Sequence, residues 1–301
     1  MQKLPIGTQA FSILRENNLL YVDKTRHIFN MIDNGRVYFL SRPRRFGKSL
    51  LVSTLDELFK GNKDLFKGLF IYDKWNWEIK YPVLKLDFGA RSYDTDEDLK
   101  KSLTYFVNSR AEQFNITLEA PMLSDRVEEL FIKLNDKTGQ KVVVLIDEYD
   151  KAITDFLSEP AKANANRKQL HNFYQVLKAA DKHIQFIFLT GISKFSGVSV
   201  FSALNNPRDI TRSKDFAAIC GYTQSELETN FADYIDTTAK ELDQSKNELL
   251  DDIRYWYNGY TWDGKTRVYN PFSTLSFFKH REFANYWIKT GTSISAKILL
   301  K

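Results

Sequence analysis

The stretch from Tyr38 to Leu50 constrains the fold of this chain more than any other. It reads Tyr-Phe-Leu-Ser-Arg-Pro-Arg-Arg-Phe-Gly-Lys-Ser-Leu. A β-rich run over residues 36–40 leads into a short basic loop, and apolar residues at helical spacing follow it. Backbone N–H groups at a helix N-terminus bind anions, so this order of strand, loop and helix is the setting of a phosphate-binding loop.

Gly47-Lys48-Ser49 forms the end of this loop. Lys48 is predicted to be exposed and to reach the β- and γ-phosphates of a nucleotide, and the Ser49 hydroxyl to bind Mg²⁺. The predicted nucleotide-binding residues are Arg44, Arg45, Phe46, Gly47, Lys48, Ser49 and Leu50.

Arg42 departs from the general loop pattern G-x-x-x-x-G-K-[ST], because it stands where the first glycine is usual. That glycine commonly permits a left-handed backbone, which costs other residues about 1–2 kcal/mol. Either Arg42 tolerates this strain or the loop follows a different path.

A pair of carboxylates follows a second apolar run. Val142 to Ile146 is typical of a strand buried on both faces of a parallel sheet, and Asp147 and Glu148 come next. Ligands bind at the carboxyl ends of such strands. Asp147 is therefore predicted to hold Mg²⁺ together with Ser49, and Glu148 to orient or deprotonate an attacking water as a catalytic residue beside Lys48.

A third apolar run, Ile184 to Leu189, ends at Thr190. A polar side chain there can bond the γ-phosphate or the attacking water, so Thr190 is the first candidate for a third catalytic residue. Ser193 and Lys194 are the next candidates. Thr, Gly and Ser are also ordinary turn residues, and that interpretation stays open.

Two further strands complete the predicted sheet, Val83 to Phe88 and Phe216 to Cys220. We expect an α/β P-loop NTPase sandwich of three layers around five mostly parallel strands. The acid pair and the Ile184 run favour the class in which an additional strand lies between the loop strand and the acid strand.

These motifs resemble the AAA-ATPase-like family of bacteria and archaea, which are P-loop ATPases related to the AAA+ and STAND groups. The resemblance covers nearly the whole chain, and Arg42 is ordinary within this family. It rests on Tyr21–Thr25, Arg42–Leu50, Ile146–Lys151, Phe201–Asn206, Trp256–Tyr260 and Tyr269–Ser273. It implies ATP and Mg²⁺ as ligands. Members often carry a C-terminal domain resembling PD-(D/E)xK nucleases, and a chain that stops at Lys301 is expected to be a fragment or a trimmed form without it.

The chain is expected to divide into an ATPase core over residues 1–221 and a helical lid with a partial winged-helix module over residues 222–301. Thr223 to Glu226 predicts a helix N-terminal capping box, and Asp263-Gly264 predicts a hairpin. Gly7 to Thr25 is expected to line the base pocket, where Tyr21 stacks on adenine or only packs in the core. Asn270-Pro271 is a candidate nucleotide contact, and residues 158–167 are expected to form a loop.

Composition narrows the function. The net charge of +5 permits contact with nucleic acid without requiring it, and no apolar run is long enough to span a membrane. The single cysteine excludes an intramolecular disulfide. Together with an N-terminus that does not resemble a secretory signal, this predicts a cytoplasmic protein.

The function expected is Mg²⁺-dependent ATP binding and hydrolysis that drives a switch. Arg44, Arg45 and Arg208 are candidates for stabilising charge in the transition state, with structural ion pairs as the alternative. Two other functions stay open: a nucleotide-gated scaffold with little turnover, and a winged-helix module that binds nucleic acid. A protein or nucleic-acid partner would use the C-terminal module, and the sequence does not indicate the oligomeric state.

Overall fold

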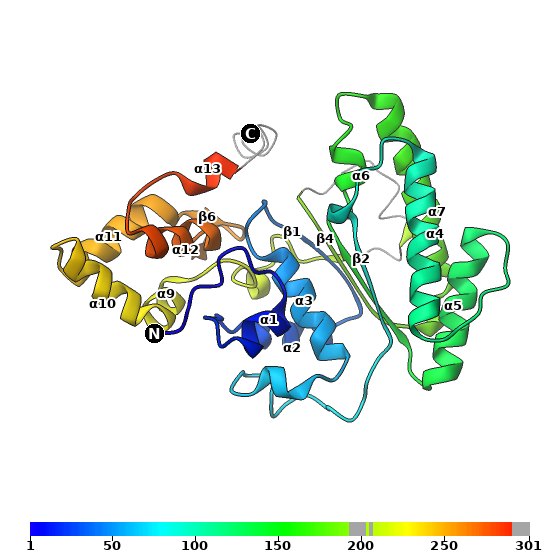
Figure 1. Ribbon diagram of the computed structural model, residues 1–301, viewed down its shortest axis with the longest axis horizontal. Helices are drawn as coiled ribbons and strands as arrows, with labels where there is room; N and C mark the ends of the chain where they lie inside the picture. The colour runs from blue at the N-terminus through cyan, green and yellow to red at the C-terminus, as the bar shows by residue number, and fades with distance from the viewer. Residues whose placement is uncertain (193–202, 205–206, 291–301) are drawn as a thin grey trace.

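The computed structural model describes residues 1–192, 203–204 and 207–290 (Figure 1). Its centre is a five-stranded parallel sheet in the order β2-β3-β4-β1-β5. The strands are β1 (Val37–Ser41), β2 (Val83–Asp87), β3 (Val142–Asp147), β4 (Ile184–Gly191) and β5 (Arg208–Asp209). β4 lies between the loop strand β1 and the acid strand β3, so the predicted class with an additional strand is confirmed.

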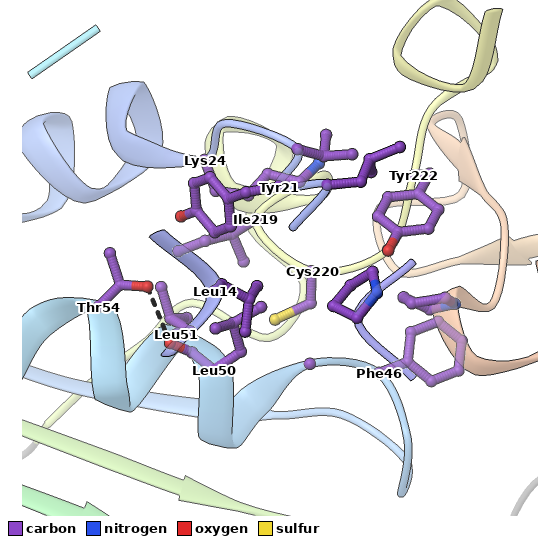
Figure 2. Close-up of a pocket in the computed structure, with 16 residues that line it drawn as sticks. Leu14, Tyr21, Lys24, Phe46, Leu50, Leu51, Thr54, Ile219, Cys220 and Tyr222 are labelled. Atoms are coloured by element: carbon purple, nitrogen blue, oxygen red, sulfur yellow. Dashed lines mark hydrogen bonds between the residues drawn. The ribbon is translucent and has the colours of Figure 1, made fainter. Parts of the chain in front are cut away.

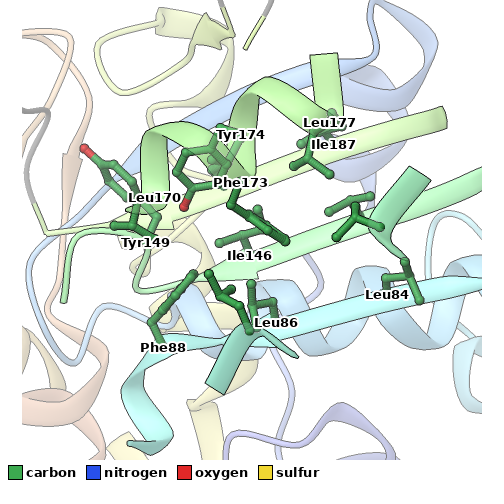
Figure 3. Packing of buried hydrophobic residues seen from close by; sticks show 14 of the residues in the cluster. Leu84, Leu86, Phe88, Ile146, Tyr149, Leu170, Phe173, Tyr174, Leu177 and Ile187 are labelled. Carbon is green, nitrogen blue, oxygen red and sulfur yellow. The ribbon is translucent and has the colours of Figure 1, made fainter. Parts of the chain in front are cut away.

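Helices cover both faces of the sheet, as the predicted three-layer α/β sandwich requires. Val143 and Leu145 of β3 pack on one face, whereas Val142, Val144 and Ile146 pack on the other. The first face is covered by α1 (Phe11–Glu16), α2 (Thr25–Asp33) and α3 (Lys48–Phe59). The second face, part of which Figure 3 shows, is covered by α4 (Asp96–Gln113), α5 (Leu123–Thr138), α6 (Lys151–Thr154) and α7 (Pro160–Ala179).

The prediction of a strand over Phe216–Cys220 is wrong. The fifth strand is the short β5, whose Arg208 and Asp209 pair with Tyr38 and Phe39 of β1. Residues 214–216 form the 3₁₀ turn η4 (Lys214–Phe216) instead. The apolar side chains of this segment, Phe216, Ile219 and Cys220, all pack on the α3 face, whereas a strand would alternate between two faces.

The loop expected over residues 158–167 is also wrong, because α7 begins at Pro160. Proline is favoured at the first helical position, and the alanines that follow are strong helix formers. Asn166 makes this turn of α7 part of the core: it is fully buried and donates to the carbonyls of Tyr93 (3.1 Å) and Ala152 (2.8 Å). The other 3₁₀ turns are η1 (Lys63–Phe66), η2 (Phe88–Ala90) and η3 (Asp181–His183).

Residues 222–290, called here the C-terminal module, lie beside the α1–α3 face (Figure 1). They form α9 (Gln224–Asn230), α10 (Ala232–Glu241), α11 (Lys246–Tyr257), a hairpin of β6 (Tyr260–Thr261) and β7 (Arg267–Val268), α12 (Pro271–His280) and α13 (Tyr286–Thr290). The predicted capping box of Thr223 and Glu226 and the predicted hairpin are confirmed.

The C-terminal module has a hydrophobic core of its own, which includes Leu227, Ile253 and Phe277. Leu20 and Val22 from the N-terminal segment also belong to this core, so the packing does not follow chain order. Among the described residues, no helix is long and apolar enough to cross a membrane.

Candidate nucleotide-binding site

The phosphate loop joins β1 to α3 and follows a path that accommodates Arg42 without strain. Arg42 is outside the left-handed region, which Arg45 (φ 67°) and Gly47 (φ 90°) adopt instead. Of the two alternatives left open by the sequence, the structure therefore shows the different path. A left-handed residue other than glycine is uncommon, so Arg45 marks the loop as a constrained segment.

Arg42 is fully buried behind the loop. Its Nη1 donates to the carbonyls of Ser41 (2.8 Å) and Thr211 (2.9 Å), and its Nη2 donates to the carbonyl of Phe216 (3.3 Å). Its guanidinium carbon lies 4.4 Å from the ring centroid of Trp262. Burial lowers the pKa of Arg42 to about 10, so the side chain stays charged at neutral pH.

Lys48 is the first residue of α3 and is buried, with only 5% of its surface exposed. The expectation of an exposed lysine is therefore wrong. Its Nζ donates to the carbonyl of Pro43 at 3.1 Å. Burial lowers the pKa of Lys48, and the negative charges of Asp147, Glu148 and Asp150 oppose this.

The acid pair lies at the carboxyl end of β3. Oδ1 of the buried Asp147 accepts from the Thr190 hydroxyl of the adjacent β4 and from the Glu148 backbone N–H (3.1 Å). Glu148 adopts a left-handed backbone (φ 52°). Burial, followed by the charge of Asp147, raises the pKa of Glu148, while Lys48 and Arg44 act in the other direction.

A third strand end, that of β2, also contributes to the acid region. A Cβ atom added to Gly89 would lie 2.6 Å from Oε2 of Glu148 and 3.0 Å from Oδ1 of Asp87. Gly89 therefore leaves the space that the Glu148 carboxylate occupies. No motif in the sequence marked Gly89, because its role depends on the register between β2 and β3.

A cleft of about 440 Å³ brings the loop and the acid region together. This volume lies within the usual range for small-molecule sites. The loop and the acid region contribute Arg44, Arg45, Gly47, Lys48, Ser49, Leu50, Glu148 and Lys151. The N-terminal segment and the C-terminal module contribute Pro5, Gly7, Thr8, Gln9, Tyr222, Pro271, Phe272 and Leu275.

A smaller apolar pocket of about 70 Å³ adjoins this cleft and shares some of its lining, including Gly47, Leu50 and Pro271. Figure 2 shows Tyr21, Phe46 and Cys220 around it. The N-terminal segment lines this pocket through Leu20, Tyr21 and Val22.

The remaining predicted residues lie in several places. Asp147 and the fully buried Thr190 are behind the cleft rather than among its lining residues. Arg208 pairs with Tyr38, within β1, and is not among the lining residues of the cleft. Ser193 and Lys194 lie outside the described residues.

Several lining residues were not identified from the sequence. Lys151, which pairs with Asp155, follows the acid pair closely enough that its position could have suggested it. Phe272 lies within the Tyr269–Ser273 motif but was not named as a lining residue, and Gly7, Thr8 and Gln9, expected at the base pocket, line the cleft. Among the described residues, no group of three or more His, Cys, Asp or Glu side chains could hold a metal ion.

The parallel sheet, with a Gly-Lys-Ser loop after β1 and an acid pair after β3, is an α/β sandwich of the P-loop type. The family described as "Predicted AAA-ATPase" matches residues 5–201, and the chain belongs to this family. The resemblance proposed from the motifs is therefore confirmed.

One relative is described as an uncharacterized protein in the vnfD 5' region of Azotobacter chroococcum mcd 1. It is 44% identical over 292 residues, which make up 97% of this chain and 54% of that protein. The chain therefore spans about half the length of this relative.

Proposed function

We propose that this chain is a Mg²⁺-dependent ATPase that binds the triphosphate in the cleft and the base in the apolar pocket. The observation that carries the proposal is the shared cleft, which is lined by Lys48 and Ser49 of the loop and by Glu148, the residue after the acid strand. These side chains come from segments about a hundred residues apart. A lysine can bind phosphate oxygens, a serine hydroxyl can bind Mg²⁺, and a carboxylate can orient water.

The donor set agrees with Mg²⁺. Asp147 supplies a carboxylate and Ser49 a hydroxyl, and both are oxygen ligands. Mg²⁺ usually takes one or two protein carboxylates and completes its shell with water and substrate phosphates. A site with few protein ligands is therefore expected, and no larger cluster exists among the described residues. When bound, the ion would neutralise charge on the β- and γ-phosphates.

The residues of this chain would have the following roles in binding and hydrolysis. Lys48 leaves the Pro43 carbonyl for a phosphate oxygen, and the N–H groups at the start of α3 hold the phosphates. Glu148 orients the attacking water and accepts its proton, which a raised pKa favours. Thr190 acts through Asp147, whose carboxylate it holds in place, rather than by touching the γ-phosphate.

Two adjacent variants test the proposal. Glu148→Gln keeps the volume of the side chain but removes the base, so Mg-ATP affinity should persist while phosphate release falls about 10²–10⁴-fold. Asp147→Asn should weaken Mg²⁺-dependent binding as well, because it removes charge next to the ion. Equal turnover of Glu148→Gln and the parent protein would show that Glu148 is not catalytic.

A parent protein that binds Mg-ATP without turnover would support the nucleotide-gated scaffold instead. The cytoplasmic location, the division near residue 221 and a protein or nucleic-acid partner bound through the C-terminal module stay predictions.

A further inference from the structure

We propose that the C-terminal module holds the phosphate loop in its nucleotide-binding shape, and that Arg42 is the positioning residue through which it acts. The inference deepens the proposed nucleotide site and rests on it for its functional meaning. The contacts themselves do not depend on any ligand.

The C-terminal module contacts four positions of the loop, 42, 44, 45 and 46. Trp262 of the hairpin lies over Arg42, and Trp287 of α13 donates its Nε1–H to the Arg44 carbonyl at 3.0 Å. Phe272 of α12 lies 5.2 Å from the guanidinium carbon of Arg45. Three elements of the module therefore contact one short loop.

Phe46 completes this set of contacts. It is fully buried and packs edge-on against Tyr260 and Trp262, with ring centroids 4.8 Å and 5.6 Å away. Tyr260 in turn packs against Trp287 at 5.9 Å. The aromatic rings therefore contact one another as well as the loop, so that a shift of the hairpin would reach several loop residues at once.

Arg42 joins this aromatic layer to the sheet. Its guanidinium binds the carbonyl at the end of β1 and two carbonyls of the connection that leads to the module, while its face is covered by Trp262. No ion pair of Arg42 is present among the described residues. A buried cation held by carbonyls and one aromatic face depends on that face for its environment.

The left-handed Arg45 makes the loop depend on these contacts. Such a backbone is unfavourable for a residue other than glycine and persists where its surroundings hold it. The contacts with the C-terminal module flank Arg45 on both sides. Loss of the contacts with the C-terminal module should therefore let the loop leave this conformation. Nucleotide binding should in turn stabilise the packing of the module against the loop, since the coupling between the two is reciprocal.

The test compares Trp262→Ala with Trp256→Ala in the whole chain. Trp256 belongs to the same module but stacks on Phe283, and it does not contact the loop in the described structure. In the nucleotide-free protein, amide hydrogen exchange of residues 44–49 should become faster in Trp262→Ala and stay at the parent rate in Trp256→Ala. Mg-ATP affinity, measured by calorimetry, should fall about 5–150-fold only in Trp262→Ala.

Trp287→Phe provides a second variant in case Trp262→Ala does not fold. It keeps an aromatic ring beside Tyr260 and removes the indole N–H that donates to the Arg44 carbonyl, so exchange at residues 44–46 should rise modestly. Trp262→Phe should bring the exchange rate of residues 44–49 most of the way back to the parent value, because it keeps an aromatic ring over Arg42.

The inference would be overturned if Trp262→Ala and Trp287→Phe both fold and exchange these amides at the same rate as the parent protein. If the parent protein binds no Mg-ATP, the proposed function fails, and the exchange measurement still decides whether the module positions the loop.

Discussion

The two halves of the candidate site are held in different ways. The acid half is held within the sheet, because Thr190 of β4 bonds Asp147 of β3 and Gly89 beyond β2 leaves space for Glu148. The loop half is held from outside the sheet, by aromatic side chains of a module with its own hydrophobic core. In the proposed function, the chemistry would therefore depend on contacts within the sheet, and nucleotide binding on contacts between the loop and the C-terminal module.

The largest effect is expected from Lys48→Ala, which removes the only lysine of the loop half that lines the cleft. With nucleotide bound, Lys48 would pair with a phosphate, and truncating one member of a buried charge pair costs about 2–5 kcal/mol. The binding free energy of Mg-ATP should therefore weaken by that amount, or binding should disappear. Calorimetric titration measures it. Lys48→Met is the matched control for packing, since it keeps the apolar stem of this buried side chain and should lose affinity equally. Parent affinity in either folded variant would contradict the site.

Gly89→Ala should damage the acid half alone. The added Cβ would lie 2.6 Å from Oε2 of Glu148 and push the flexible end of that side chain aside. A displacement of about 1 Å can cost about 10²-fold in rate. Phosphate release should therefore fall while Mg-ATP affinity stays at the parent value. A fall in affinity with an unchanged rate would place Gly89 in the binding half instead.

Thr190→Val should give a smaller effect at the same strand ends. The variant keeps the shape of the side chain and leaves Oδ1 of the buried Asp147 without its hydroxyl donor. Partners that orient a metal ligand are typically worth about 10–100-fold in metal affinity. The Mg²⁺ concentration that gives half-maximal turnover should rise by that factor, and Thr190→Ser should restore it. An unchanged Mg²⁺ requirement would remove Thr190 from the account.

The smallest effect is expected from Arg45→Gly. Glycine relieves a left-handed strain of about 1–2 kcal/mol, but the variant loses the contact with Phe272, worth about 0.5–1 kcal/mol at an exposed site. The free energy of unfolding in urea should change by about 1 kcal/mol or less. A loss well beyond this would show that Arg45 holds the loop more strongly than its one aromatic contact indicates.

The acid half was largely predictable from the sequence, and the loop half only in part. The apolar runs ending at Asp147 and Thr190 are buried strands. Parallel strands place their carboxyl ends at one edge of the sheet, so these polar residues were expected to lie close together. The apolar residues of the Phe216–Cys220 segment suggested a strand. In the structure, the Phe216 carbonyl accepts from Arg42, and Phe216, Ile219 and Cys220 pack on the same face of the sheet.

Arg42 itself shows why the rest could not be predicted. The sequence marked it as a departure from the glycine pattern, but its partners, Thr211, Phe216 and Trp262, are distant in the chain and have no motif. The left-handed backbone lies at Arg45 instead, whose side chain is near Phe272 of the C-terminal module. Residues that act through tertiary contacts leave no local pattern to read.

A structure of the protein with Mg²⁺ and a non-hydrolysable ATP analogue tests the central claim most directly. We expect the triphosphate in the cleft, with Nζ of Lys48 moved from the Pro43 carbonyl to within about 3.2 Å of a β- or γ-phosphate oxygen. Trp262 should remain over Arg42, and Asp147 and Ser49 should lie at the ion. A nucleotide bound away from this cleft, or Lys48 still bonded to Pro43 beside bound phosphates, would contradict the account.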